Sequence, residues 1–163
     1  MVAALSQKLF AANCNIEDAT MTRLCGEFAM ILVVVPPRGL STPALAARLA
    51  ELQESHGLKI GCNDFDDAEN TADTQGAPRF MLSVYGPDKT GLVAHTSQVL
   101  AAHHVNITDL QTRVAVSHTV YVMLFELEFP PALAVETLRA ALDAAALELG
   151  VEYSLNALDT DAL

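Results

Sequence analysis

The loop at residues 86–91, with the sequence GPDKTG, carries the residues best suited to bind a small anion. It follows an apolar run and precedes a segment with helical spacing, so the amides of Thr90, Gly91 and Leu92 stand where a helix begins. Unpaired N–H groups and the positive end of the helix dipole meet there, and both favour a carboxylate. Asp88 offers a carboxylate to an ammonium group. The loop therefore predicts a site for a small α-amino acid.

Other interpretations of this loop differ in how well they fit the residues. Gly86 and Gly91 are expected to let the backbone approach a ligand closely. A nucleotide-binding P-loop is excluded, because Lys followed by Ser or Thr must come directly after the second glycine and Leu92 stands there. The glycine spacing also differs from that of a dinucleotide-binding fingerprint. A purely structural interpretation stays open, in which Asp88 and Thr90 only cap the helix.

Two polar residues follow the predicted helix, at the start of the next predicted strand. Asn106 offers a donor and an acceptor together, and Asp109 adds a carboxylate. Both are expected to come near the loop of the same chain or of a neighbouring subunit. The alternative is that Asn106 only adopts the left-handed turn after the helix. Asp109 has a counterpart in Asp18, which suggests a role in the fold as readily as a role in binding.

The chain offers little material for catalysis or for metal binding. Four histidines are loosely clustered, but no cysteine or carboxylate completes a metal set (His95, His103, His104 and His118). Cys25 stands in a predicted hairpin turn, and no Ser-His-Asp or Cys-His pairing has supporting context. We therefore expect a non-catalytic protein without cofactor or metal.

Charge and composition narrow the classes of partner. The formal net charge is −11 with nine Lys plus Arg, which argues against direct binding to nucleic acid. No apolar run reaches the length of a membrane span, and the N-terminus does not resemble a secretion signal. The three cysteines form no C-x-x-C pair (Cys14, Cys25 and Cys62). A reduced, cytoplasmic setting is expected.

An internal repeat organises the chain. The sequence MVAALSQKLFAANCNIED at 1–18 matches LVAHTSQVLAAHHVNITD at 92–109 at a constant offset. Later landmarks also correspond: Met30 parallels Met123, and Gly57 parallels Gly150. Two copies of one small unit therefore follow each other.

The second copy predicts the order of elements in this unit. Thr90 is expected to cap its first helix, and Gly150 suits the end of its second. The predicted order is strand, helix, strand, strand, helix, strand, at 80–85, 92–103, 106–116, 119–129, 135–149 and 151–157. This order is the ferredoxin-like βαββαβ unit.

The first copy predicts the same elements except the first strand. They are a helix, two strands, a helix that begins at Thr42-Pro43 and stops at Gly57, and a last strand, at 2–13, 16–25, 27–35, 42–56 and 58–65. The fold class is α+β, with two ferredoxin-like repeats of which the first lacks its N-terminal strand and loop. The predicted domains are 1–65 and 80–163, joined by an acidic linker at 66–79.

The missing strand has consequences for the first sheet. In a ferredoxin-like sheet this strand is central, so its absence leaves a gap about two strand spacings, or roughly 10 Å, wide. We expect one of three outcomes: the third and fourth strands close up, a partner chain fills the gap, or the recorded start belongs to a truncated form. The sequence MILVVV at 30–35 is apolar throughout, so both faces of that strand are expected to be covered, one by helices and the other by the second repeat or another subunit.

These residues resemble a known family. GPDKTGLVAHTSQVLAAHHVNITDLQTR at 86–113 resembles the opening of an ACT domain: a Gly-x-Asp-x-x-Gly loop, an amphipathic helix, then Asn-Ile and an acidic residue. CNIEDATMTRLCGEFAMILVVVPP at 14–37 resembles the first ACT repeat of the glycine cleavage system transcriptional repressor family, whose members are tandem ACT proteins without a catalytic domain. The resemblance covers nearly the whole chain and departs at the N-terminus, where the first loop is absent.

The resemblance implies a regulatory function and completes the predicted site. ACT domains generally bind small ligands, often amino acids, and the repressor-like family is thought to act on a transcriptional activator. The predicted ligand-binding residues are Asp88, Thr90, Gly91, Leu92, Asn106, Ile107 and Asp109. The expected partners are a small amino acid and a transcription factor or metabolic enzyme, in a homo-oligomer without direct contact to nucleic acid or membrane.

Two other functions fit the sequence. The chain resembles the tandem ACT regions of phosphoserine phosphatases and formyltetrahydrofolate deformylases, so it is alternatively a stand-alone regulatory module of an amino-acid or one-carbon metabolic enzyme. A structural assembly domain that binds no ligand is the third candidate. Ligand titration separates the third candidate from the others.

Overall fold

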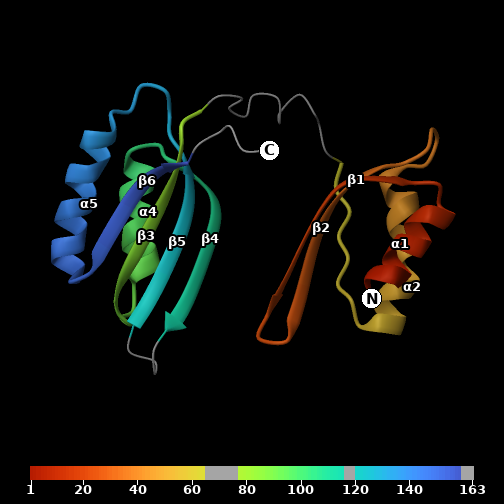
Figure 1. Cartoon of the computed structure of the whole chain (residues 1–163). Coiled ribbons are helices and arrows are strands. Elements are labelled where there is room, and N and C mark those ends of the chain that lie inside the picture. The colour runs from red at the N-terminus through yellow and green to blue at the C-terminus, as the bar shows by residue number, and fades with distance from the viewer. Residues whose placement is uncertain (65–76, 116–119, 159–163) are drawn as a thin grey trace. The chain divides into compact units, whose positions relative to one another are not determined.

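The computed structural model describes residues 1–64, 77–115 and 120–158 (Figure 1). The chain divides into two compact units, Met1–Asp67 and Ala68–Leu163. Most of the predicted linker, residues 66–76, lies outside the described residues, and its last residue, Arg79, already begins a strand.

The second unit has the predicted βαββαβ order. Its elements are β3 (Arg79–Pro87), α4 (Leu92–Ala102), β4 (Asn106–Ala115), β5 (Val120–Glu128), α5 (Val135–Leu149) and β6 (Glu152–Leu158). The strands form one sheet in the order β4-β5-β3-β6, and every neighbouring pair is antiparallel. The ferredoxin-like prediction is therefore confirmed, with β3 in a central position.

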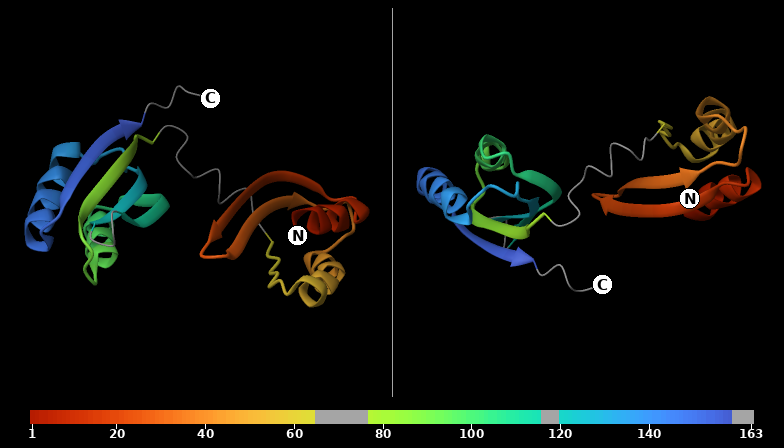
Figure 2. Two further views of the ribbon diagram at one scale, coloured as in Figure 1. Left: turned by 60° about the horizontal axis from the view of Figure 1, so that its bottom comes forward. Right: turned by 90° about the horizontal axis from the view of Figure 1, so that it is seen from above.

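The core of the second unit lies between the sheet and its two helices. Both helices cover the same face of the sheet (Figure 2). Every second residue of the central strands points to that face, as strand geometry requires, and these residues are buried (Phe80, Leu82 and Val84 from β3; Met123, Phe125 and Leu127 from β5). Leu100 of α4 and Leu138 of α5 close the core from the other side, each with no exposed surface.

The first unit is smaller and more open. It contains α1 (Val2–Ala11), β1 (Asn15–Leu24), β2 (Glu27–Val35) and α2 (Thr42–His56). The two strands form an antiparallel hairpin whose turn residues, Cys25 and Gly26, both have positive φ, of 50° and 89°. Two such residues make the type I′ turn that suits a tight hairpin. The predicted hairpin turn at Cys25 is confirmed.

The last strand predicted for the first unit is wrong. Residues 58–64 run as coil without strand pairing (Figure 1), and residue 65 lies outside the described part. Among residues 1–64 the sheet consists of β1 and β2, and β2 does not pair with residues 58–64, so the expected closing up of these two segments is not found. A strand needs a hydrogen-bonded neighbour, and here the expected neighbour is absent from residues 1–64.

Within the first unit, the helices cover one face of β2, as expected, and coverage of the other face by the second repeat or another subunit stays a prediction. Leu32 and Val34 pack against a helical cluster that includes Leu9 and Leu49. Ile31, on the opposite face of the hairpin, is 70% exposed. The first unit therefore covers β2 on one face only.

Glycine and proline mark the ends of two helices, as their backbone preferences predict. Gly57 after α2 and Gly150 after α5 both adopt the left-handed conformation with φ of 65°. Pro43 stands in the first turn of α2, where its missing N–H has no intrahelical partner to lose. In the ranges that the structure describes, no helix is long and apolar enough to cross a membrane.

A hydrogen bond from Tyr153 connects β6 to α5 and makes the free energy of unfolding depend on pH. Its hydroxyl donates to Asp143 Oδ1 at 2.7 Å, and burial followed by this hydrogen bond raises the pKa of Tyr153. Because the pKa is raised in the folded state, this stabilisation is fully present below the ordinary tyrosine pKa and is lost as pH rises through the folded-state pKa.

Tyr153→Phe is expected to lower the free energy of unfolding by about 1 kcal/mol at neutral pH, because one net hydrogen bond is lost. The difference from the unmodified protein should shrink as pH rises through the folded-state pKa. Urea unfolding at a series of pH values measures this difference. Tyr85→Phe, at an exposed tyrosine of β3, is the matched control. Equal loss in both variants, or a difference that grows with pH, contradicts the prediction.

Candidate functional site

The loop between β3 and α4 leaves the start of the helix without a side-chain cap. Gly91 is the N-cap residue, with φ of 96°, and no side chain makes a capping hydrogen bond. The prediction that Thr90 caps this helix is therefore wrong, and so is the structural alternative in which Asp88 and Thr90 serve only as caps. The first-turn amides of α4 keep their capacity to bind an acceptor.

The predicted loop residues differ in what they can offer to a ligand. The side chains of Asp88 and Thr90 are exposed. Leu92 is only 2% exposed because its side chain lies in the core, so it can contribute only its backbone amide. The loop thus combines one free carboxylate, one free hydroxyl and a run of backbone donors.

Packing accounts for one glycine of the loop and backbone geometry for the other. A Cβ on Gly86 would lie 2.7 Å from Cγ1 of Val151, so Val151 fills the space that the glycine leaves. At Gly91 the positive φ itself favours glycine, and a Cβ would lie 3.3 Å from Cδ2 of His95. The expectation that both glycines make room for a ligand is thus not supported at Gly86.

Two groups that can carry positive charge stand beside the loop. Lys89 Nζ donates to the carbonyl oxygen of Leu149 at 3.3 Å, at the end of α5. A cation there is favoured by the negative end of the α5 dipole. His95 lies one turn into α4, with its ring next to Gly91. The surroundings of the loop therefore suit an anion.

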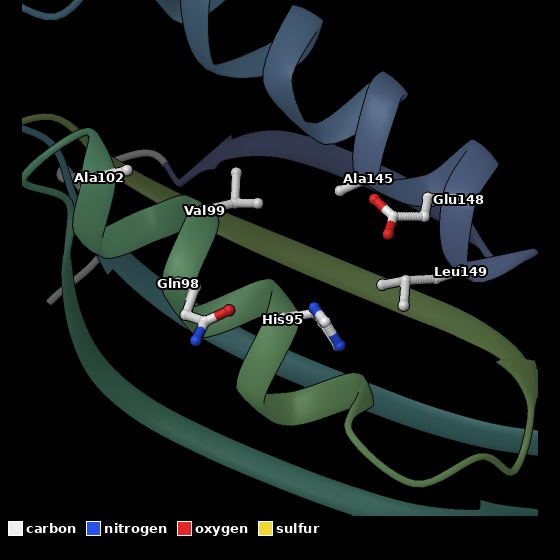
Figure 3. Close-up of a pocket in the computed structure, with 7 residues that line it drawn as sticks. All are labelled: His95, Gln98, Val99, Ala102, Ala145, Glu148 and Leu149. Carbon is white, nitrogen blue, oxygen red and sulfur yellow. The ribbon is translucent and has the colours of Figure 1, made fainter.

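His95 also lines a groove between α4 and α5 (Figure 3). The groove has a volume of about 240 Å³ and is lined by His95, Gln98, Val99, Ala102, Ala145, Glu148 and Leu149. His95 and Glu148 point into the space between the two helices from opposite sides (Figure 3). The groove thus offers an imidazole and an amide from α4 and a carboxylate from α5, over an apolar base.

The sequence analysis missed Gln98 and Glu148 and assigned no ligand role to His95. On α4, His95, Gln98 and Ala102 follow the three-to-four-residue spacing of one helical face, which is a detectable signal. Glu148 lies 50 residues beyond Gln98, and its approach to α4 depends on how the two helices pack on the sheet. No local pattern predicts that approach.

The second group of predicted site residues lies at the far end of the same sheet. Asn106 pairs with Glu128, which pairs with Arg79 at the start of β3, whereas the loop follows Pro87 at its end. Eight strand residues separate these levels, a distance of about 26 Å. Within one unit the structure does not bring Asn106, Ile107 and Asp109 to the loop.

These three residues have local partners. The side-chain amide of Asn106 donates to Glu128 Oε2 at 3.2 Å, and Asp109 Oδ2 accepts from Gln111 Nε2 at 3.1 Å. Ile107 packs against the core. Asn106 begins β4 and does not take the left-handed turn, which falls on His104 with φ of 56°. The alternative interpretation of Asn106 is therefore wrong.

A β-bulge accounts for part of the repeated Asn-Ile-x-Asp sequence. The register of β4 with β5 shifts between Ile107 and Asp109, and the register of β1 with β2 shifts at the same place, between Ile16 and Asp18. One extra residue in each strand bends the strand and re-aims the side chains that follow. In both units the Asn-Ile-x-Asp sequence thus contains the bulge of its strand.

The described part of the chain contains no group of three or more His, Cys, Asp or Glu side chains that could hold a metal ion. The three cysteines are free, and Cys25 is exposed.

Comparisons with known proteins agree with this architecture. The family model described as ACT domain matches residues 79–156. A UPF0237 protein of Methanopyrus kandleri is 39% identical over 74 residues, which are 45% of this chain and 81% of that protein. A UPF0237 protein of Methanocaldococcus jannaschii is 35% identical over 74 residues, with the same shares of the two chains.

Two solved structures share the fold over most of the chain. An unknown protein from Galdieria sulphuraria has a TM-score of 0.77 at 24% identity, covering 98% of this chain and 91% of its own. A protein described as a candidate glycine cleavage system transcriptional repressor has a TM-score of 0.67 at 18% identity, covering 98% of this chain and 90% of its own. At these identities the likeness concerns the fold.

Proposed function

Because the chain belongs to the ACT-domain family, we propose that it is a non-catalytic regulatory protein whose second unit binds a small amino acid. The observation that carries the proposal is the uncapped start of α4, with His95 placed between it and the groove that contains Glu148. Backbone amides and the imidazole suit the carboxylate of an α-amino acid, and Glu148 or Asp88 suits its ammonium group.

Binding at this place would act on the conformation of the second unit. The groove is formed by two helices, and Lys89 already connects the loop to the end of α5. A ligand that contacts both helices favours the arrangement that contacts it best, and can thereby change the affinity for a partner. We propose a protein partner in the cytoplasm, such as a transcriptional activator of glycine cleavage genes, in line with the described role of one structural relative.

A homo-oligomer is the arrangement that could join the two predicted residue groups in one site. The loop residues and the group at Asn106, Ile107 and Asp109 lie at opposite ends of the sheet. They can therefore form one site only if the loop of one copy meets the start of β4 of another. Sedimentation with and without amino acids tests this part of the proposal.

Titration calorimetry with glycine, serine and other small amino acids tests the binding itself. Saturable binding is expected, and Glu148→Gln should weaken it about tenfold or more, because a charge-assisted hydrogen bond contributes roughly 1.5–3 kcal/mol. Glu136→Gln, an exposed substitution in the first turn of α5, is the matched control and should leave the affinity unchanged.

Two results would contradict the proposal. One is the absence of binding by any of these amino acids up to millimolar concentration. The other is equal weakening by Glu148→Gln and Glu136→Gln, which would place the ligand outside the groove.

A further inference from the structure

The groove between α4 and α5 has a polar end and an apolar end (Figure 3). His95, one turn into α4, and Glu148 of α5 form the polar end, and Ala102 lies at the other end of α4. Seven residues separate His95 from Ala102, which is about 10 Å along a helix axis. The groove therefore extends well beyond the place where the carboxylate and ammonium groups of an amino acid would bind.

Half-buried apolar side chains form the base of the groove. They are Val99 from α4 and Ala145 and Leu149 from α5. Of the residues that the structure describes around the groove, only His95 and Glu148 ionise, and both belong to the polar end. A charged group near Ala102 would therefore meet no lining residue of opposite charge, whereas an apolar group there would exchange water for apolar surface.

The base of the groove is closed toward the core of the second unit. Behind it lies a cavity of about 10 Å³, and Ala145 and Leu149 line this cavity as well as the groove. Its volume is at the lower limit for a single water molecule, so it has no room for part of a ligand. A ligand side chain that stays in the groove must therefore lie along the two helices, from the polar end toward Ala102.

We infer that the amino acid bound in this groove carries an extended apolar side chain, such as that of leucine or norleucine, which lies on Val99, Ala145 and Leu149. The inference rests on the proposed function, since the head group must bind at the polar end, and it names the class of amino acid that the site selects. Glycine and alanine have the same head group but leave the base of the groove in water. Each methylene group that the groove removes from water is expected to tighten binding about fourfold.

Titration calorimetry of the unmodified chain with alanine, leucine, norleucine and lysine tests the inference. Leucine and norleucine should bind about tenfold more tightly than alanine, because the open groove covers part of each added methylene group. Lysine has the carbon chain of norleucine with an ammonium group at its end. It should bind more weakly than norleucine, because the apolar end of the groove gives this charge no partner.

Paired variants at the end of α4 locate the ligand side chain. Ala102→Phe fills the apolar end of the groove and should weaken norleucine binding about tenfold, and alanine binding far less. Ala101→Phe, at an exposed neighbour outside the groove lining, is the matched control and should leave both affinities unchanged. Alanine binding by the Ala102→Phe chain verifies that it is folded. If that binding is lost as well, the ligand series on the unmodified chain is decisive.

Two results would overturn the inference. One is an affinity that does not rise from alanine to leucine and norleucine, and the other is equal weakening of norleucine binding by Ala102→Phe and Ala101→Phe. The proposed function has a separate test, because Glu148→Gln acts on the head group that all these ligands share. If Glu148→Gln weakens binding while the ligand series is flat, the proposed function stands and this inference falls. Absence of binding by every ligand would overturn both.

Discussion

Gly86→Ala is expected to destabilise the second unit by about 1–3 kcal/mol, as overpacking of a filled core does. The added Cβ would stand 2.7 Å from Cγ1 of Val151 and 3.2 Å from its Cα, so rotation of the side chain alone cannot relieve the clash. Because Gly86 precedes the loop and Val151 follows α5, the strain would fall between β3 and the corner from α5 to β6. Urea unfolding followed by circular dichroism measures the loss.

A second substitution identifies the cause. If the clash with Val151 is responsible, the double variant with Val151→Ala should lose less stability than the two single changes predict by addition. The recovery should be partial, because alanine removes the contact with Cγ1 at 2.7 Å and keeps those with Cβ and Cα at 3.1 and 3.2 Å. Gly61→Ala, at a glycine with nothing within 4 Å of its Cβ position, is the matched control and should change stability by a few tenths of a kcal/mol. Strictly additive losses at Gly86 and Val151 would contradict the explanation.

The two units are expected to unfold separately, the first at a much lower urea concentration. The second unit buries thirteen apolar residues in its core, whereas the first buries five. An isolated two-stranded hairpin is marginal, and each fully buried large side chain contributes roughly 1.5–3 kcal/mol. The first unit is therefore expected to open at a lower free energy than the second.

Hydrogen exchange across a urea series measures both openings in one sample. Amides of α1, α2 and β2 should exchange through openings of low free energy, while those of β3 and β5 persist to the global transition. A single transition with equal protection in both units would contradict this prediction.

The second unit was predictable from sequence because its local signals agree with one another. Alternation in β5, helical spacing in α4 and a glycine after α5 all predict the same fold. The repeat gives independent sequence support for the elements that have a counterpart in the first unit. Even the hairpin turn at Cys25-Gly26 could be located, since its length and glycine specify a tight connection.

The last strand of the first unit was not predictable, although its pattern is present. Leu58, Ile60 and Cys62 alternate as a strand requires, and the structure places all three against the helices. What decides strand formation is a hydrogen-bonded neighbour, and residues 1–64 supply none for residues 58–64. Local sequence determines which side chains face the core but not whether the neighbour exists.

The candidate site was predictable only in part, for a similar reason. The loop and the start of α4 are contiguous in sequence, so their position could be inferred from one motif. The groove needs His95 and Glu148 from different helices, and their approach follows from packing on the sheet. The capping role of Thr90 failed because Gly91 adopts the left-handed conformation and itself takes the N-cap position.

The bulge shared by β1 and β4 bears on the history of the chain. It inserts one residue at the same point of both units, within the matching Asn-Ile-x-Asp sequences. An irregularity at equivalent places is inherited most simply from a single ancestral unit that was duplicated. The bulge is then older than the duplication. Both units have kept this detail of strand geometry while the residues around it changed.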